Sequence, residues 1–176
     1  MPVLIALLGV LVVAALWYWR VRAARDAAGE SLEAAQDVRR AARRFGFRRQ
    51  ANRHPADCIE DARLAAMGVV AAMAEYDGPH TKDEIDQMVV EAQVTFGVDK
   101  REAEEIVAFG RWIATQCGTR HEAVRRLSKV VAQLAGSAAA PDLLRMAEAA
   151  AAHRGPPDER ARSAIETIRR AFPVKV

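Results

Sequence analysis

Three short segments repeat one pattern: a Thr or Asp is followed three residues later by a Glu, directly before apolar residues at helical spacing. They begin at Thr81, Asp99 and Thr119. In such a capping box the first side chain accepts a hydrogen bond from a free N–H group at the start of a helix, while the Glu reaches back to the cap. Apolar residues three and four positions apart mark the buried face of that helix. The pattern predicts three helices that begin directly after these caps.

Glycine and proline residues divide the C-terminal two thirds of the chain into segments of similar length. Breaks stand at Asp77-Gly78-Pro79, Gly97, Gly136 and Gly155-Pro156-Pro157. Ala dominates the apolar residues, aromatic residues make up only 6%, and no alternating Val/Ile/Thr run indicates a strand. We therefore predict an all-α domain, a compact bundle of about six short helices.

The first part of the chain has the composition of a membrane anchor. The 17 residues from Val3 to Trp19 carry no charge, a length at the short end of what spans a bilayer. Aromatic residues and then arginines follow at the expected headgroup level. The predicted membrane-interface residues are Trp17, Tyr18, Trp19, Arg20, Arg22 and Arg25.

The flanks of this apolar run favour an uncleaved anchor over a signal peptide. Only Met1 and Pro2 precede it, and bulky aromatic residues stand where a cleavage site needs small ones. Because basic residues favour the inner side of a membrane, we expect the N-terminus outside and the rest in the cytoplasm. We predict an anchor at 1–20, a basic juxtamembrane helix or linker at 21–55, and a helical domain at 56–176 at the bacterial inner membrane.

The juxtamembrane region concentrates the basic charge of the chain. Between Arg20 and His54 there are ten Arg and four acidic residues, although the whole chain has a net charge of only +3. Two interpretations remain open: the region lies on anionic lipid, or it is a solvated stalk. Because few aromatic residues accompany the arginines, we expect no nucleic-acid partner. The expected partners are membrane lipid and one or more proteins.

Two stretches of the helical domain echo each other. Residues 75–89 and 152–168 share a Gly-Pro break, a polar cap shortly after it and an amphipathic helix, and each follows an Ala-rich helix. This echo predicts two related helical hairpins within one domain.

The first of these stretches carries a family signature. After an Ala-rich helix come Ala74-x-x-Asp77-Gly78 and then Glu84, six residues past the Gly. Over residues 61–172 the chain resembles the TerB-like (tellurite-resistance TerB) family. The resemblance implies a two-hairpin helical fold, an acidic surface able to take a divalent cation, and a role in membrane-associated stress or partner assembly. It implies no catalytic activity.

The order of anchor, basic stalk and helical domain also resembles the front half of DjlA-type membrane co-chaperones. The J domain that follows in those proteins, with its His-Pro-Asp motif, has no counterpart among these 176 residues. We therefore expect no co-chaperone activity.

The candidate metal ligands are Asp77, Asp83 and Glu84, for calcium or zinc. The alternative needs no ion, because acidic residues at the start of a helix favour its positive end and Glu84 can complete the capping box. In the second stretch, Arg154 and Ala161 stand at the positions of Asp77 and Glu84. A second carboxylate site is therefore not expected.

Other motifs give little sign of catalysis. The sequence holds no Gly-x-Ser-x-Gly, no phosphate-binding Gly loop and no HExxH. We expect His80 to be an exposed loop residue, and Cys58 and Cys117 to be reduced thiols. The predicted function is a non-enzymatic interaction or scaffold module linked to membrane stress. The alternative is an accessory or assembly subunit of a larger membrane complex.

Overall fold

The computed structural model describes residues 35–172, apart from the side chain of Asp77, and every regular element among them is helical. This confirms the all-α class. The predicted helix starts after Thr81, Asp99 and Thr119 are also confirmed. The elements are a helical segment at 35–44, η1 (Pro55–Cys58), α2 (Ala62–Ala74), η2 (Glu75–Asp77), α3 (Lys82–Phe96), α4 (Lys100–Thr115), α5 (Arg120–Ala135), η3 (Ser137–Ala139), α6 (Ala140–Ala152) and α7 (Glu159–Ala171).

The predicted anchor, with its interface residues at 17–25, lies outside the described residues. Within 35–172, none of the helices combines the length and the apolar character that crossing a bilayer requires.

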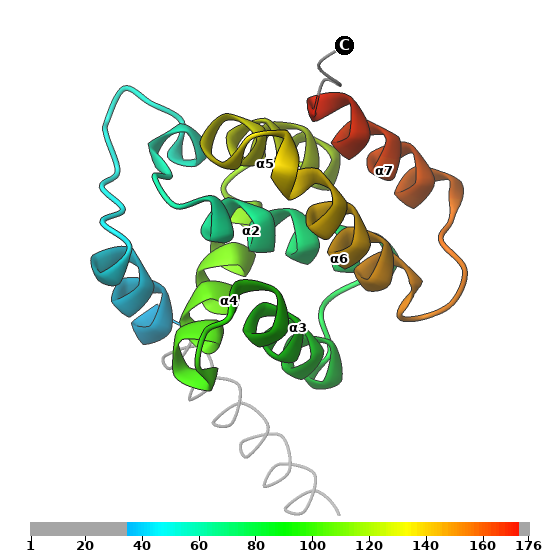
Figure 1. Cartoon of the computed structure of the whole chain (residues 1–176), viewed down its shortest axis with the longest axis horizontal. Coiled ribbons are helices and arrows are strands. Elements are labelled where there is room, and N and C mark those ends of the chain that lie inside the picture. Colours follow the sequence, from blue (N-terminus) through cyan, green and yellow to red (C-terminus); the bar gives the residue numbers. More distant parts are fainter. Residues whose placement is uncertain (1–34, 173–176) are drawn as a thin grey trace, which may run out of the picture. The chain divides into compact units, whose positions relative to one another are not determined.

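Helix α2 lies at the centre of the domain, among α3, α4, α5 and α6 (Figure 1). Every residue from Leu64 to Ala74 is buried, so the helix has no solvent-facing side. Because most of its residues are Ala, Gly or Val, neighbouring helices can approach it from several directions at once.

Two glycines permit the closest of these approaches. A Cβ atom on Gly68 of α2 would lie 2.8 Å from a methyl carbon of Leu127 and 2.9 Å from one of Ile113. A Cβ atom on Gly110 of α4 would lie 2.8 Å from the backbone of Met67. The crossing of α2 with α4 and α5 therefore depends on the missing side chains at these positions.

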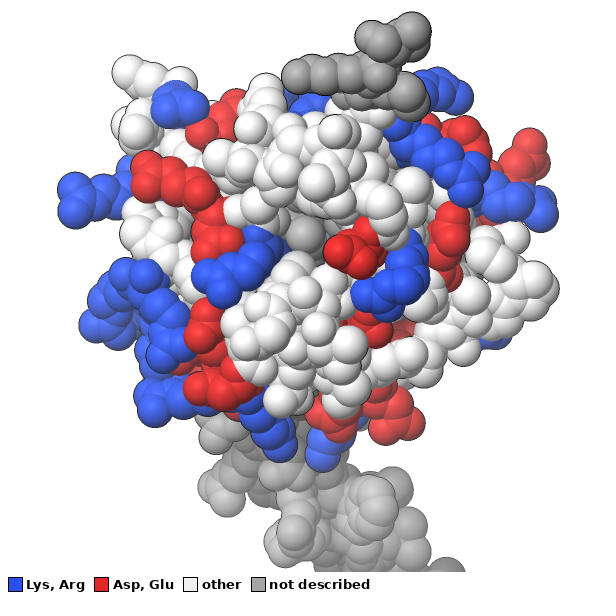
Figure 2. Space-filling model, viewed as in Figure 1, with Lys and Arg blue, Asp and Glu red and all other residues white. Residues whose placement is uncertain are grey.

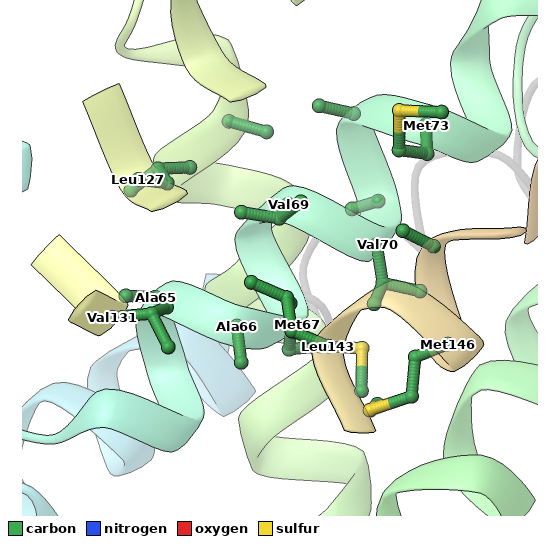
Figure 3. Close-up of a cluster of buried hydrophobic side chains, with 14 of the residues drawn as sticks. Ala65, Ala66, Met67, Val69, Val70, Met73, Leu127, Val131, Leu143 and Met146 are labelled. Atoms are coloured by element: carbon green, nitrogen blue, oxygen red, sulfur yellow. The ribbon is translucent and has the colours of Figure 1, made fainter. Parts of the chain in front are cut away.

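Figure 3 shows the side chains that join α2 to its neighbours. Leu127 and Val131 of α5 lie on one side of α2, and Leu143 and Met146 of α6 lie on another. All four are at most 2% exposed. Burying a side chain of this size stabilises the fold by roughly 1.5–3 kcal/mol, so this core holds both predicted hairpins together.

The three predicted caps are present, but only one forms the full reciprocal box. Thr81 accepts a hydrogen bond from the backbone of Glu84, and the Glu84 carboxylate accepts one from the Thr81 backbone. Asp99 and Thr119 cap α4 and α5 in the forward direction. The Glu of each of those caps pairs with arginines instead. Glu102 pairs with Arg63 from another helix, whereas Glu122 pairs with Arg125 and Arg126 of its own helix.

The compact unit of the described chain begins at Asp37. Residues 37–54, which the sequence analysis assigned to a juxtamembrane linker, therefore belong to it. We call these residues the strap. Aromatic contacts fix it: the ring of Phe47 meets the rings of Phe109 and Trp112 edge-on, at centroid distances of 5.1 and 5.6 Å.

Charged contacts fix the strap as well. Arg44 lies 3.2 Å from a carboxylate oxygen of Glu102 and 3.1 Å from one of Glu105, both on α4. The guanidinium of Arg63 lies over the ring of Phe45, 5.1 Å from its centroid. Glu105 is buried, so its charge needs a partner such as Arg44. The strap is thus part of the packed domain.

Candidate functional site

The turns that join α2 to α3 and α6 to α7 follow similar backbone paths. We call residues 75–81 the first joint and 152–158 the second joint. Gly78 has φ 127° and Gly155 has φ 137°, values that residues with side chains rarely adopt. In each joint the helix cap, Thr81 or Asp158, stands three residues after the Gly. These matching turns support the predicted pair of related hairpins.

Glu84 is the central side chain of the site. It stands in the first turn of α3 and is only 3% exposed. Its Oε2 atom accepts hydrogen bonds from the backbone N–H of Thr81 at 2.7 Å and from the Thr81 hydroxyl at 3.0 Å. The capping box thus places a buried carboxylate at the first joint.

Arg154, from the second joint, completes this arrangement. Its Nε and Nη2 atoms each donate to a different oxygen of Glu84, both at 2.7 Å, which forms a bidentate pair. Nη2 also donates to the carbonyl oxygen of Pro79 at 2.6 Å. A Cβ atom on Gly78 would lie 3.1 Å from Nη1 of Arg154, so the glycine makes room for the guanidinium. We call the contact between Arg154 and Glu84 the latch.

These donors set the protonation of Glu84. The hydrogen bonds from Arg154, followed by those from Thr81, lower its pKa from 4.5 to about 2, although burial acts in the opposite direction. Glu84 is therefore a carboxylate at neutral pH, neutralised by a guanidinium of the same chain.

The structure separates the predicted metal ligands. Glu84 faces Arg154, whereas Asp83, the residue before it in the helix, is exposed. Asp77 lies in η2, and its side chain is outside the description. In the described part of the chain, no three His, Cys, Asp or Glu side chains lie close enough to hold a metal ion. Both carboxylate oxygens of Glu84 already accept hydrogen bonds, from Arg154 and from Thr81, so this predicted ligand is engaged within the chain.

His80 differs from its sequence-based expectation. We expected an exposed loop residue, but the side chain is only 3% exposed, and its Nε2 atom lies 3.2 Å from a carboxylate oxygen of Glu75. Neither ring nitrogen makes a well-aligned hydrogen bond. Burial lowers the pKa of His80, and the nearby Glu75 only partly opposes this shift. At neutral pH the ring is therefore uncharged and packs as part of the first joint.

The state of the two cysteines agrees with the expectation of free thiols. Cys58 and Cys117 are both unpaired and buried. Burial raises the pKa of Cys117 to about 11, so its sulfur remains protonated at neutral pH.

Comparisons with protein-family models, with curated proteins and with solved structures found no match to this chain. The resemblance to the TerB-like family therefore rests on the sequence signature alone.

The pairing of Glu84 with Arg154 was not predicted from the sequence. There, Arg154 indicated only that a second carboxylate site is missing. The usable signal was the echo itself, because the second stretch has a cation where the first has Asp77 and a small residue where the first has Glu84. A positive residue in one turn and a negative residue near the other are the charges that an ion pair between the two turns would need.

Proposed function

We propose that this chain is a membrane-tethered, TerB-like interaction module that presents helix α3 to a protein partner in the cytoplasm. The observation that carries the proposal is an exposed apolar stripe on α3. Val90 is 57% exposed and Val94 is 74% exposed, one helical turn apart. Among the described residues, Leu134 is the remaining large apolar side chain with comparable exposure. Exposed apolar side chains that gather on one element favour association with another protein.

The surroundings of this stripe favour a rigid binding surface. The opposite, buried side of α3, which includes Met88 and Val89, packs mainly on α4 and also on α2 and α6. Arg145 of α6 forms an ion pair with Glu91 and donates to the hydroxyl of Thr95, at 2.8 Å. Figure 2 shows an uncharged surface over α3 in the lower centre of the view. A helix fixed in this way presents its outer residues with little loss of conformational entropy on binding.

In this proposal the first joint is a structural element, and its resident cation is the guanidinium of Arg154. The cation hypothesis for Asp77, Asp83 and Glu84 then has a direct test. We expect calorimetric titration of the full chain with calcium or zinc at millimolar concentration to release no binding heat. A saturable heat signal that disappears in the Glu84→Gln variant would restore the divalent-cation site.

Site-specific crosslinking tests the partner surface. A photoreactive phenylalanine analogue at position 94 is expected to give one discrete adduct on irradiation of cells. The matched control carries the same analogue at Arg162, an exposed position on α7. No adduct at position 94, or the same adducts from both positions, would contradict the proposal.

The same experiment addresses the alternative function. An adduct with an integral membrane protein of a defined assembly would favour the accessory-subunit role. An adduct with a soluble protein that fractionates with the membrane only when this chain is present would favour the scaffold role. Recovery of the chain itself in the soluble fraction would contradict the anchor.

A further inference from the structure

The strap has two faces of different character. In its helical part, Ala41 is fully buried, whereas Arg39 and Arg43 are exposed. With 100° per residue, Arg39 and Arg43 share one side of the helix and Ala41 lies on the opposite side. Beyond the helix, Phe45 and Phe47 are half-buried, while Arg48 and Arg49 are exposed.

The inner face is fixed to the domain by the contacts already described. Arg44 reaches Glu102 and the buried Glu105, and Phe47 enters the aromatic cluster on α4. These contacts leave Arg44 unavailable to a partner outside the domain.

The outer face consists of arginines without acidic partners in the described chain. Arg40 pairs with Asp37 and Arg53 donates to the carbonyl oxygen of Asp57, so both are engaged. Arg43 makes only a long bond, 3.4 Å, to a backbone carbonyl. Basic side chains gather at the left edge of the view in Figure 2, where Figure 1 places the helical segment 35–44. Within the strap, the exposed arginines that have neither an acidic partner nor a short hydrogen bond among residues 35–172 are Arg39, Arg43, Arg48 and Arg49.

We propose that these four arginines bind the anionic lipid headgroups of the membrane and thereby fix the orientation of the domain on its surface. The inference rests on the proposed membrane anchor. Guanidinium groups match phosphate in charge and in bidentate geometry, and juxtamembrane basic residues are attracted to anionic leaflets. Because the inner face of the strap is packed on α4, a lipid contact at its outer face positions the whole domain.

The position of the strap along the chain supports this occupant. Only residues 20–34 separate the uncharged run from the described chain. Even fully extended, this stretch reaches no more than about 50 Å. Along the chain, the strap is therefore the described segment that follows most closely on the predicted anchor.

The test uses the full chain in lipid nanodiscs of neutral phosphatidylcholine, with or without phosphatidylglycerol. Amide hydrogen exchange is measured over residues 39–49. We expect exchange about tenfold slower in the anionic discs. The difference should vanish when all four outer arginines are changed to Gln. The matched control removes four exposed positive charges elsewhere, by changing Lys129, Arg160, Arg162 and Arg170 to Gln, and should retain it.

Several outcomes would overturn the inference. These are equal exchange in both kinds of disc, equal loss in the control variant, or equal protection in neutral discs by added duplex DNA. A chain that does not stay with the discs contradicts the anchor instead. In that case, lipid binding by the strap is tested by flotation of the chain with phosphatidylglycerol vesicles. Binding that the four-Gln strap variant loses supports the inference, and no binding overturns it.

Discussion

The first and second joints have similar backbones and complementary side chains. Each has a glycine at a φ near 130° and a cap three residues later. The first joint leads to Glu84, whereas the matching position after the second joint is Ala161. The second joint carries Arg154, whose guanidinium binds Glu84 across the domain.

The difference shows that turn geometry and turn chemistry are set separately. Glycine, proline and the cap fix the path of the chain, and they do so in both joints. The charged positions can then differ between the two turns. Here they differ so that one turn neutralises a carboxylate that the other has buried, which joins the two hairpins by a specific contact.

Removing Arg154 should lower the stability of the domain more than the other substitutions proposed for the two joints. Arg154→Ala leaves the buried Glu84 carboxylate without its cation, and we expect the free energy of unfolding to fall by about 3–4 kcal/mol. Urea unfolding of the full chain in detergent measures this change. The matched control, Arg162→Ala on the exposed side of α7, should change it by less than about 0.5 kcal/mol.

A second variant separates the charge from the packing of the arginine. Combining Arg154→Ala with Glu84→Gln removes the buried charge, and part of the lost stability should return. A double variant no more stable than Arg154→Ala would show that the latch acts through packing alone.

Acid should weaken the latch in a defined range. The pKa of Glu84 is about 2 in the folded chain and 4.5 without its partners. The stabilisation is therefore complete above pH 4.5 and is lost as the pH falls toward 2, by about 3 kcal/mol at most. Urea unfolding across this range should give a smaller decrease for Glu84→Gln than for the wild type. Parallel decreases for both proteins would contradict the role of this carboxylate.

The two glycines allow a matched test of the space that the guanidinium occupies. An alanine at either position is strained by the positive φ, at a cost of about 1–3 kcal/mol. The Cβ atom of Gly78→Ala also meets Nη1 of Arg154 at 3.1 Å, whereas that of Gly155→Ala meets no heavy atom within 4 Å apart from its chain neighbours. We expect Gly78→Ala to be the more destabilising in thermal unfolding. Equal losses would indicate that the arginine moves aside freely.

The caps should show the smallest difference. Asp158→Ala removes one hydrogen bond to the backbone of α7, a loss of about 1 kcal/mol. Thr81→Ala removes the corresponding bond in α3 and also the hydroxyl donor to Glu84. Its loss should therefore exceed that of Asp158→Ala, as measured by urea unfolding. The opposite order would mean that the hydrogen bond from the Thr81 hydroxyl contributes little to the stability of the Arg154–Glu84 pair.

Much of the fold was predictable because its signals are local. The starts of α3, α4 and α5 follow from the caps, and the joints follow from Gly and Pro. The burial of His80 was not predictable in the same way, since a loop position says nothing about the surrounding helices. The sequence predicted an Ala-rich helix before the first joint, but small residues allow contact on all sides without requiring it, so the burial of every residue from Leu64 to Ala74 is a result of tertiary packing.

The caps in the sequence specify where α3, α4 and α5 begin, and the Gly-Pro breaks mark the two joints. These properties depend on backbone preferences and on hydrogen bonds that span three or four residues. Tertiary packing brings Arg154 to Glu84, and Arg44 of the strap to Glu105 on α4. Such contacts join residues far apart in the chain, and they exist only once packing around α2 has fixed the helices relative to one another.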